Sequence, residues 1–447
     1  MAKEYTYSNY FTVFFIFINT LGRNLTYLLL GSYFFCYTIP QSIFNLFYVY
    51  DRISVHFLFL AVLNLISLLL ILRKYTIDEF LSLFKERPHS YSYLLFIVFG
   101  LISILIAENK TESIVTITQT LIFFSSYVII VFLSKLKNIN FIKVFAVFTL
   151  MAVFIESIYI NYLFYDSILI GGNSLDRSNQ FSGFTANINI SSFSLCLKIP
   201  LLFYLIFNTK GNAVKLLTLI MIFSSILTIL LLGGRASIIA LTFILLFIVI
   251  ICILNTNKLK IVTLSLSILT IVLSLSAYQY FNQNNTSSRV VERFSSVFNP
   301  VEDQSVKERL NFYSTAFQSI KNRPLLGVGI GNWKLISIKY SKDLIEDYRV
   351  PYHVHNDFLQ VAAEIGLFGG VAYLYFIFLP FVMSIKKFLL DREKKFNQYA
   401  LIILIFGVYI FDSLLNFPMA RPVNFIYLLF AIALFYVSYK TNSNDEK

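Results

Sequence analysis

The sequence predicts an all-α integral membrane protein with about twelve transmembrane helices, and three observations support this fold class. Of the 447 residues, 57% are apolar and only 13% are charged, which is about half the charged share of a soluble domain. Phenylalanine occurs 48 times, whereas glycine and proline occur only 16 and 9 times. The apolar residues gather in long runs, and such helices satisfy their own backbone in a bilayer.

Each predicted span is an apolar run close to the roughly 20 residues that cross the hydrocarbon core. The start of the first span is the hardest to place, because residues 11–20 are also apolar and Arg23 interrupts the run. The twelve predicted spans are 24–48, 54–72, 91–107, 112–134, 141–165, 185–208, 213–232, 236–254, 260–279, 357–385, 397–415 and 422–439.

Lysine and arginine predict the orientation of these spans. With the N-terminus in the cytoplasm, the short inner loops carry sixteen basic residues and the short outer loops carry five. This asymmetry follows the positive-inside rule, so both termini are predicted to be cytoplasmic. It also accounts for the net charge of +12 without a nucleic acid partner. The five outer residues are Arg52, Lys110, Arg177, Arg235 and Arg421.

The predicted organisation has three parts. Residues 1–279 hold spans one to nine, residues 280–356 form a large outward loop, and residues 357–447 hold the last three spans. Within the loop, Ser305–Ile320 has helical spacing and predicts an amphipathic helix lying on the membrane surface or on the bundle. Its predicted apolar face consists of Leu310, Tyr313, Ala316, Phe317 and Ile320.

Disulfide and metal chemistry are not indicated. Cys36, Cys196 and Cys252 lie singly inside apolar stretches, which gives neither a disulfide framework nor metal-ligand spacing. His353 and His355 form a His-x-His pair, but no third ligand is evident nearby.

His355 is the candidate catalytic residue. It lies in VPYHVHNDFLQVAAEIGLFGG, at the outer mouth of the tenth span, where two of the four histidines fall. Histidine is the side chain best suited to accept a proton near neutral pH. The alternative is a histidine with a purely structural role at the membrane interface.

Two outward arginines are candidates for binding phosphate. Arg235 lies in the short LGGRA hairpin, and Arg309 lies on the predicted amphipathic helix. Arginine binds phosphate in bidentate fashion and keeps its charge. Together with a histidine, they predict a diphosphate clamp beside a proton acceptor. The alternative is that both are charges reaching the membrane surface.

Further polar residues are secondary candidates. Ionisable groups inside a bilayer are costly and are often functional, although each could equally be half of a buried pair. The glycines of GVGIGNW are interpreted as a tight turn, because no strand and helix flank them as in a nucleotide-binding fold. The secondary candidates are Glu156, Lys198, Glu364 and Asp412 in spans, and Arg177 and Asn187 near the outer surface.

Several of these motifs together resemble one family. HNDFL followed by EIGLFG, the upstream block RLNFYSTAFQSIKNRPLLGVGIGNW, and the Arg235-Ala236 pair are similar to the signature of the O-antigen ligase and Wzy-type polymerase superfamily. The spacing of Arg177, Gly183 and Asn187 fits as well. The resemblance covers about residues 170–370, and the remaining spans match only in number and orientation.

Membership of this superfamily would imply a GT-C-like bundle in the bacterial inner membrane, with its active site facing the periplasm. The donor would be a glycan on undecaprenyl diphosphate, and the reaction would be inverting and metal-independent, with no cofactor. Arg235 and Arg309 would hold the diphosphate, and His355 would orient or deprotonate the acceptor hydroxyl. His353, Asn356, Arg177, Asn187 and Glu364 would be supporting residues.

The acceptor remains open among the superfamily's activities. A polymerase extends a lipid-linked repeat unit of O-antigen or capsule, a ligase moves the finished glycan to lipid A–core, and a third group glycosylates proteins. The motifs do not separate these activities; the polymerase is favoured because such chains are numerous and diverse, with a chain-length regulator as a further partner. The opposing class is a non-enzymatic transporter of lipid-linked sugars. Polar groups clustered at one face, and a long outward loop, argue against a transporter, which concentrates polar groups at the midplane.

Overall fold

A computed structural model shows a helical protein, and the residues that it describes contain no strand. The described residues are 29, 31–33, 52–72, 75–85, 88–135, 140–171, 183–185, 187–254, 272, 304–340, 351–391 and 396–444. Their helices are α2 (Arg52–Leu72), α3 (Ile77–Lys85), α4 (Pro88–Ser103), η2 (Ile104–Ile106), α5 (Lys110–Ser134), α6 (Phe141–Gly171), η4 (Gly183–Thr185), α7 (Ile188–Asn208), α8 (Asn212–Leu232), α9 (Arg235–Leu254), α12 (Gln304–Asn322), α13 (Trp333–Tyr340), α14 (Asp357–Leu390), α15 (Gln398–Leu415), η7 (Pro418–Ala420) and α16 (Pro422–Asn444).

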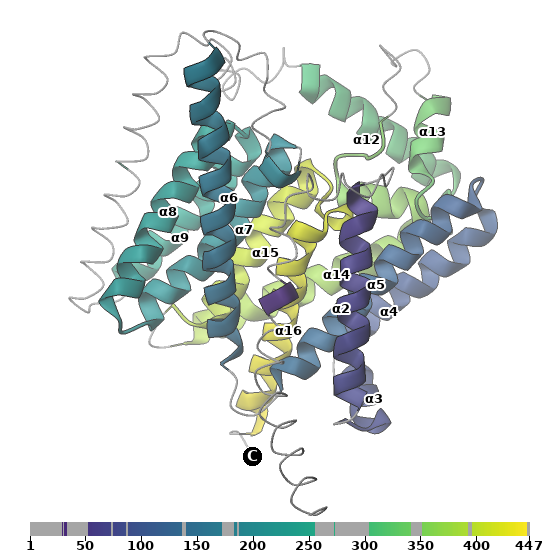
Figure 1. The fold of residues 1–447 in the computed structure, drawn as a ribbon. Helices are drawn as coiled ribbons and strands as arrows, with labels where there is room; N and C mark the ends of the chain where they lie inside the picture. The colour runs from purple at the N-terminus through teal and green to yellow at the C-terminus, as the bar shows by residue number, and fades with distance from the viewer. Residues whose placement is uncertain are drawn as a thin grey trace, which may run out of the picture.

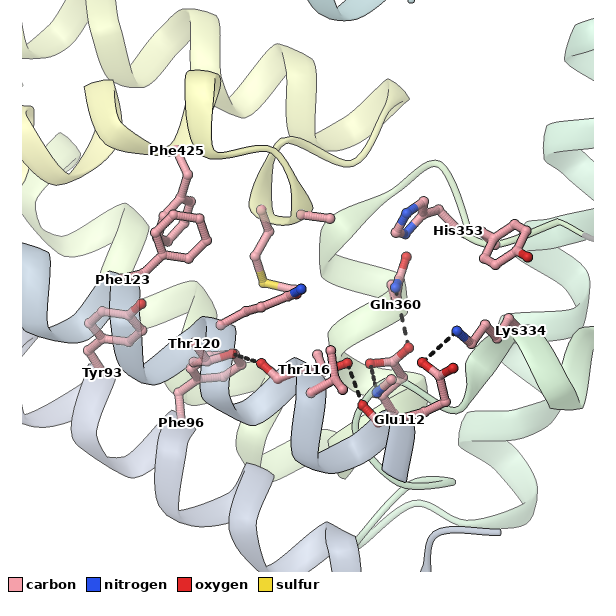
Figure 2. Close-up of a pocket in the computed structure, with 17 residues that line it drawn as sticks. Tyr93, Phe96, Glu112, Thr116, Thr120, Phe123, Lys334, His353, Gln360 and Phe425 are labelled. Carbon is pink, nitrogen blue, oxygen red and sulfur yellow. Dashed lines mark hydrogen bonds and ion pairs between the residues drawn. The ribbon is translucent and has the colours of Figure 1, made fainter. Parts of the chain in front are cut away.

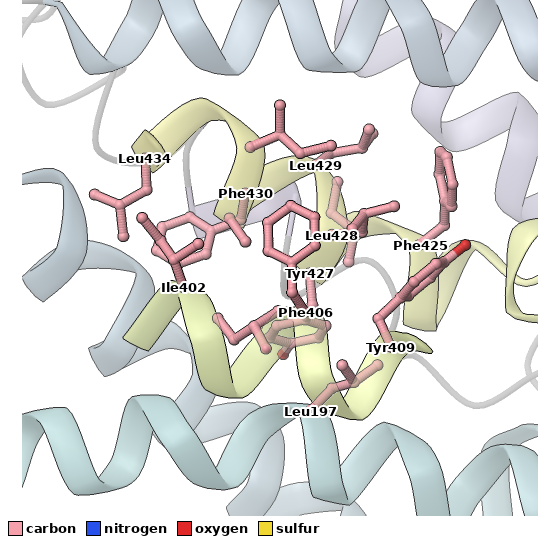
Figure 3. Packing of buried hydrophobic residues seen from close by; sticks show 14 of the residues in the cluster. Leu197, Ile402, Phe406, Tyr409, Phe425, Tyr427, Leu428, Leu429, Phe430 and Leu434 are labelled. Atoms are coloured by element: carbon pink, nitrogen blue, oxygen red, sulfur yellow. The ribbon is translucent and has the colours of Figure 1, made fainter. Parts of the chain in front are cut away.

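The helices form one bundle whose centre is the hairpin of α15 and α16 (Figure 1). Helices α6 to α9 pack on one side of this hairpin, and α2, α4 and α5 lie on the other. In the apolar segment of α7, 89% of the residues are buried, and in that of α15, 72% are. In the other candidate spans at most half of the residues are buried. The outer helices therefore turn apolar side chains outward, as lipid-facing helices do. Figure 3 shows the aromatic and aliphatic packing of α15 and α16 against Leu197 of α7.

Eight described helices are long and apolar enough to cross a membrane, and a bent pair formed by α2 and α3 would make a ninth. The prediction of an all-helical membrane fold is confirmed, but the count of twelve is not. The apolar part of α16, Pro422–Ser438, is shorter than a standard span. The predicted spans 24–48 and 260–279 lie outside the described residues apart from a few positions, so the orientation and the full span count stay predictions.

The predicted amphipathic helix is present as α12, and its buried face agrees with the predicted one in part. Helix α12 packs on α14, and it does so through Phe312, Tyr313, Ala316 and Ile320. Leu310 and Phe317 were predicted on that face and are instead 59% exposed. The contact with α14 selects a face one residue to the side of the most apolar stripe, because Thr315 and Ser319 bond to their own helix and bury readily.

Helix α14 is broken at Gly366, and the glycine-rich turn after α12 fills the break. Gly366 has φ 81° and ψ 174°, a conformation that is essentially restricted to glycine. The freed carbonyls of Ala363 and Glu364 accept hydrogen bonds from the backbone N–H groups of Val328 and Gly329, at 3.0 and 2.8 Å. The prediction that GVGIGNW forms a turn is correct, and the turn's partner is this break in the helix.

Substituting alanine for Gly366 is expected to destabilise the protein by about 2–3 kcal/mol or more. An added Cβ would collide with the backbone of Leu325 and Leu326, and the backbone conformation would be strained as well. Gly370→Ala is the matched control, because the new Cβ would meet only the Ala362 side chain and backbone, at 3.2 Å or more. Thermal unfolding of the purified proteins in detergent checks this difference, and equal midpoints for the two variants would contradict it.

Candidate active site

His355 occupies a strained position immediately before α14. Its φ of 58° makes it the one described non-glycine residue with a positive φ, a conformation that costs on the order of 1–3 kcal/mol and that often marks functional sites. The chain is held on both sides of it. The Val354 N–H donates to the Gln360 side-chain oxygen at 3.2 Å, and the Tyr313 hydroxyl donates to the His355 carbonyl at 3.2 Å.

Three helices meet at the end of α15 next to this residue. The Leu414 carbonyl, near the C-terminus of α15, accepts from the Tyr313 hydroxyl at 3.1 Å and from the Asn356 amide at 3.4 Å. Helix C-termini leave such carbonyls without partners in the helix itself. Asn356 also caps α14 by accepting from the Leu359 N–H at 3.0 Å. Asn356, predicted as a supporting residue, thus fixes the start of α14 against α15.

The imidazole of His355 lies among aromatic rings and arginines. It stacks on Phe312, with the ring centroids 6.0 Å apart, and meets the edge of Phe417 at 5.1 Å. The Arg421 guanidinium lies 4.8 Å from the centroid of the same Phe417 ring. The segment carrying Arg421 is positioned by Asp357, whose carboxylate accepts from the Met419 N–H at 2.9 Å.

Both histidines are neutral near pH 7. Burial, followed by the charges of Arg309 and Arg421, lowers the pKa of His355 to about 4. Burial, Arg421 and His355 lower the pKa of His353 to about 3. Since the folded pKa values lie below the ordinary 6.5, the unfolded chain takes up protons first, and stability falls as the pH drops from about 6.5 towards 4. Above that window both imidazoles can accept protons.

His353 faces a separate cavity of about 210 Å³ between α4, α5, α14 and the η7–α16 turn. In Figure 2, Tyr93, Phe96, Phe123 and Phe425 gather at one end of this cavity. His353, Gln360, Lys334 and Glu112 lie at the other end (Figure 2). The imidazole of His353 stacks on Phe417, with the centroids 4.1 Å apart. Phe417 therefore contacts both histidines, while His355 and Arg309 are not part of the cavity wall.

Glu364 organises the backbone beside the cavity. Its carboxylate accepts from the Gly331 N–H at 2.7 Å and from the Trp333 N–H at 3.4 Å, and the Gln360 amide donates to it at 3.3 Å. It therefore anchors the first turn of α13, where N–H groups lack helical partners. Such a contact fits a supporting residue.

The remaining predicted residues are placed as follows. Arg235 begins α9, which packs on α15 through Phe243 and Phe411. Eight residues of helix put Arg235 about 12 Å from Phe243 towards the end of the bundle where α15 ends. Asn187 caps α7 by accepting from the Asn189 and Ile190 N–H groups, and Arg177 lies outside the described residues.

The intramembrane charges of the central helices have internal partners. Lys198 of α7 pairs with Glu156 of α6 and donates to the Ser194 hydroxyl at 2.6 Å. The Asp412 carboxylate accepts from the Asn416 and Asn424 amides at 2.9 and 2.7 Å. Among the described residues, no group of three histidine, cysteine, aspartate or glutamate side chains could hold a metal ion.

Sequence reasoning overlooked Arg421, Phe417 and Tyr313. Arg421 was treated only as an outer-loop charge, and its segment NFPMARP offers one signal: an arginine between two prolines in a short connection between spans. Its approach to His355 depends on the pairing of Asp357 with Met419, two residues far apart in the sequence. Nothing local in the sequence indicates this pairing.

Comparison with known proteins supports the resemblance seen in the motifs. No curated protein matches the chain. The described residues form helices with candidate membrane spans, and residues 219–374, which include Arg235, Arg309, His353 and His355, match the model of the O-antigen ligase family.

Proposed function

We propose that this protein is a membrane glycosyltransferase that moves a glycan from undecaprenyl diphosphate to an acceptor hydroxyl, acting as a Wzy-type polymerase of O-antigen or capsule repeat units. The observation that carries the proposal is His355, a neutral imidazole in a strained backbone conformation, whose pKa is lowered by burial and by Arg309 and Arg421. Proton acceptors beside fixed cations suit a reaction in which a hydroxyl attacks and an anion leaves.

In the proposed reaction, the acceptor oxygen attacks the anomeric carbon of the donor sugar as His355 takes the hydroxyl proton. The bond between that carbon and the diphosphate oxygen breaks, and its electron pair leaves with undecaprenyl diphosphate. A single displacement inverts the configuration at the anomeric carbon. The donor is already activated, so the protein needs to supply positioning, a base and charge neutralisation.

Arg309 and Arg421 are proposed to hold the diphosphate. Both lower the pKa of His355, so both charges act where the leaving group would develop its own charge. Arginine binds phosphate oxygens in pairs and cannot lose its proton, and this replaces the charge that a metal ion supplies in other glycosyltransferases. Arg235, near the same end of the bundle, would contact the donor as well. His353 supports the acceptor side.

The proposed location is the inner membrane of a bacterium, with this end of the bundle facing the periplasm. Its support is the excess of basic residues in the loops predicted to be cytoplasmic. Helices α12 and α13 lie above α14, whereas the last turns of α16 and α3 lie at the opposite end (Figure 1). The partners are the lipid-linked oligosaccharide, its acceptor, the bilayer and a chain-length regulator.

Ligation of the finished glycan to lipid A–core is the second candidate. The description of the matching family model, O-antigen ligase, favours it. The same base and the same arginines would serve, because only the acceptor differs.

A one-substrate assay separates these functions. The purified protein is incubated with an undecaprenyl-diphosphate oligosaccharide repeat unit and chelator, and glycan length is read on a gel. A ladder of products is expected for a polymerase. Elongation that appears only after lipid A–core is added would instead identify a ligase. If neither acceptor supports transfer, while vesicles containing the protein translocate the lipid-linked sugar, the transferase proposal is wrong.

A further inference from the structure

The cavity beside His353 differs in chemistry from the arginine-rich surroundings of His355. Among the described residues that line it, Lys334 is the one lysine or arginine, and its ammonium lies 2.6 Å from the Glu112 carboxylate. The wall also contains a second acidic residue, Glu364. A cation that is already paired, beside a second carboxyl group, disfavours the binding of a phosphate. The cavity is therefore suited to an uncharged group and not to the diphosphate.

The wall combines hydrogen-bonding side chains with aromatic rings. Gln119 lines the cavity, and the buried Nδ1 atom of His353 has no hydrogen-bond partner within the described part of the chain. Tyr352 is 64% exposed at the mouth, where the Lys334 ammonium lies 5.3 Å from its ring centroid. A purely apolar ligand such as an isoprenoid chain would leave these polar groups unpaired, at a cost in free energy.

A sugar ring matches both features. It presents hydroxyl groups around its edge and apolar C–H groups on its faces, so it can pair with amides and imidazoles while it packs on aromatic rings. The cavity volume of about 210 Å³ is of the size that one ring occupies rather than a long chain.

The position of the cavity fits the acceptor. Phe417 stacks on His353, which faces the cavity, and its edge touches His355. A sugar held beside His353 would therefore lie next to the proposed base, and on the side away from Phe312 and Arg309. The donor diphosphate occupies the arginine side in the proposed reaction.

We propose that this cavity is the acceptor subsite, and that it binds one uncharged hexose or N-acetylhexosamine ring of the acceptor glycan through Gln119, Gln360 and His353. The assignment of the bound sugar as the acceptor rests on the proposed transferase function, but the binding of a neutral sugar can be tested without turnover.

Thr120→Phe is the test variant, and Thr118→Phe is its matched control. Thr120 lines the cavity, and its hydroxyl is bonded to the Thr116 carbonyl of its own helix at 2.9 Å. Thr118 makes the equivalent bond to Ile114 at 2.7 Å but is exposed on the outer face of α5. Both variants add the same bulk to the same helix, and only the first fills the cavity.

Binding is read by saturation-transfer difference NMR on the purified full-length protein. The probes are free glucose, galactose, N-acetylglucosamine and N-acetylgalactosamine, with inorganic pyrophosphate binding measured separately. We expect signals from at least one sugar with the wild-type protein, a loss of tenfold or more in Thr120→Phe, no change in Thr118→Phe, and equal pyrophosphate affinity throughout.

Three results would overturn the subsite. The first is the absence of sugar signals from the wild-type protein, and the second is an equal sugar signal from Thr120→Phe. The third is displacement of the sugars by undecaprenyl monophosphate in the wild type, which would show that a lipid chain occupies the cavity. If the sugars bind as expected but no elongation or ligation occurs, the subsite stands as a sugar site and the transferase function falls.

Discussion

Replacing His355 with alanine is expected to lower glycan transfer by about 10²–10⁴-fold, which is the usual contribution of a general base. Burial, together with the charges of Arg309 and Arg421, lowers the pKa of this imidazole to about 4, so it is neutral and able to accept a proton near pH 7. The protein should still insert into membranes, because His355 is only partly buried and belongs to no span. The measurement is product formation per mole of purified, membrane-inserted protein.

The backbone at this position requires a second variant. His355 has φ 58°, and alanine tolerates that region less well than asparagine does. His355→Asn should therefore keep the local fold and the wild-type thermal midpoint, while losing transfer to the same extent as the alanine variant. Activity retained in His355→Asn would mean that this position needs only its backbone conformation, and the role of base would pass to His353.

The sequence predicts most of the helices because each one has to bury its own backbone polar groups in lipid. The apolar runs that predict spans 112–134, 213–232 and 236–254 end within two residues of α5, α8 and α9. The break in α14 was not predicted, since Gly366 lies inside an apolar run that otherwise continues. Its cause is the turn at Val328 and Gly329, which bonds to the freed carbonyls from a distant part of the chain.

The candidate site was only partly predictable for the same reason. His355 and Arg309 could be selected because charged or titratable side chains at a membrane surface are costly without a role. The buried face of α12 was predicted only in part: Tyr313, Ala316 and Ile320 pack as expected, whereas Leu310 and Phe317 are exposed. Arg421 is held near the histidines by the hydrogen bond between the Met419 N–H and the Asp357 carboxylate. This tertiary contact leaves no periodic pattern in the sequence.

Arg309→Gln is expected to change two observables at once. Loss of the guanidinium should reduce transfer by about 10²-fold or more, the effect of removing one preorganised partner of a developing anion. It should also move the acidic limb of the pH profile. Burial and two arginines hold the pKa of His355 at about 4, so removing one positive charge raises that pKa towards 6.5, with burial still keeping it below. The acidic limb of the pH profile of kcat/KM reports the pKa values of the free enzyme. It should therefore move from near pH 4 to a higher pH.

Arg309→Lys separates the two effects, because lysine keeps the charge and loses the bidentate geometry. Its transfer rate should fall while the acidic limb stays near the wild-type position. Arg323→Gln is the control for a lost charge, since Arg323 follows the end of α12 and is exposed; both observables should remain unchanged. A wild-type rate in Arg309→Gln would remove Arg309 from the diphosphate site. A reduced rate with an unmoved limb would show that the group titrating in the profile is not His355, because that imidazole responds to the Arg309 charge.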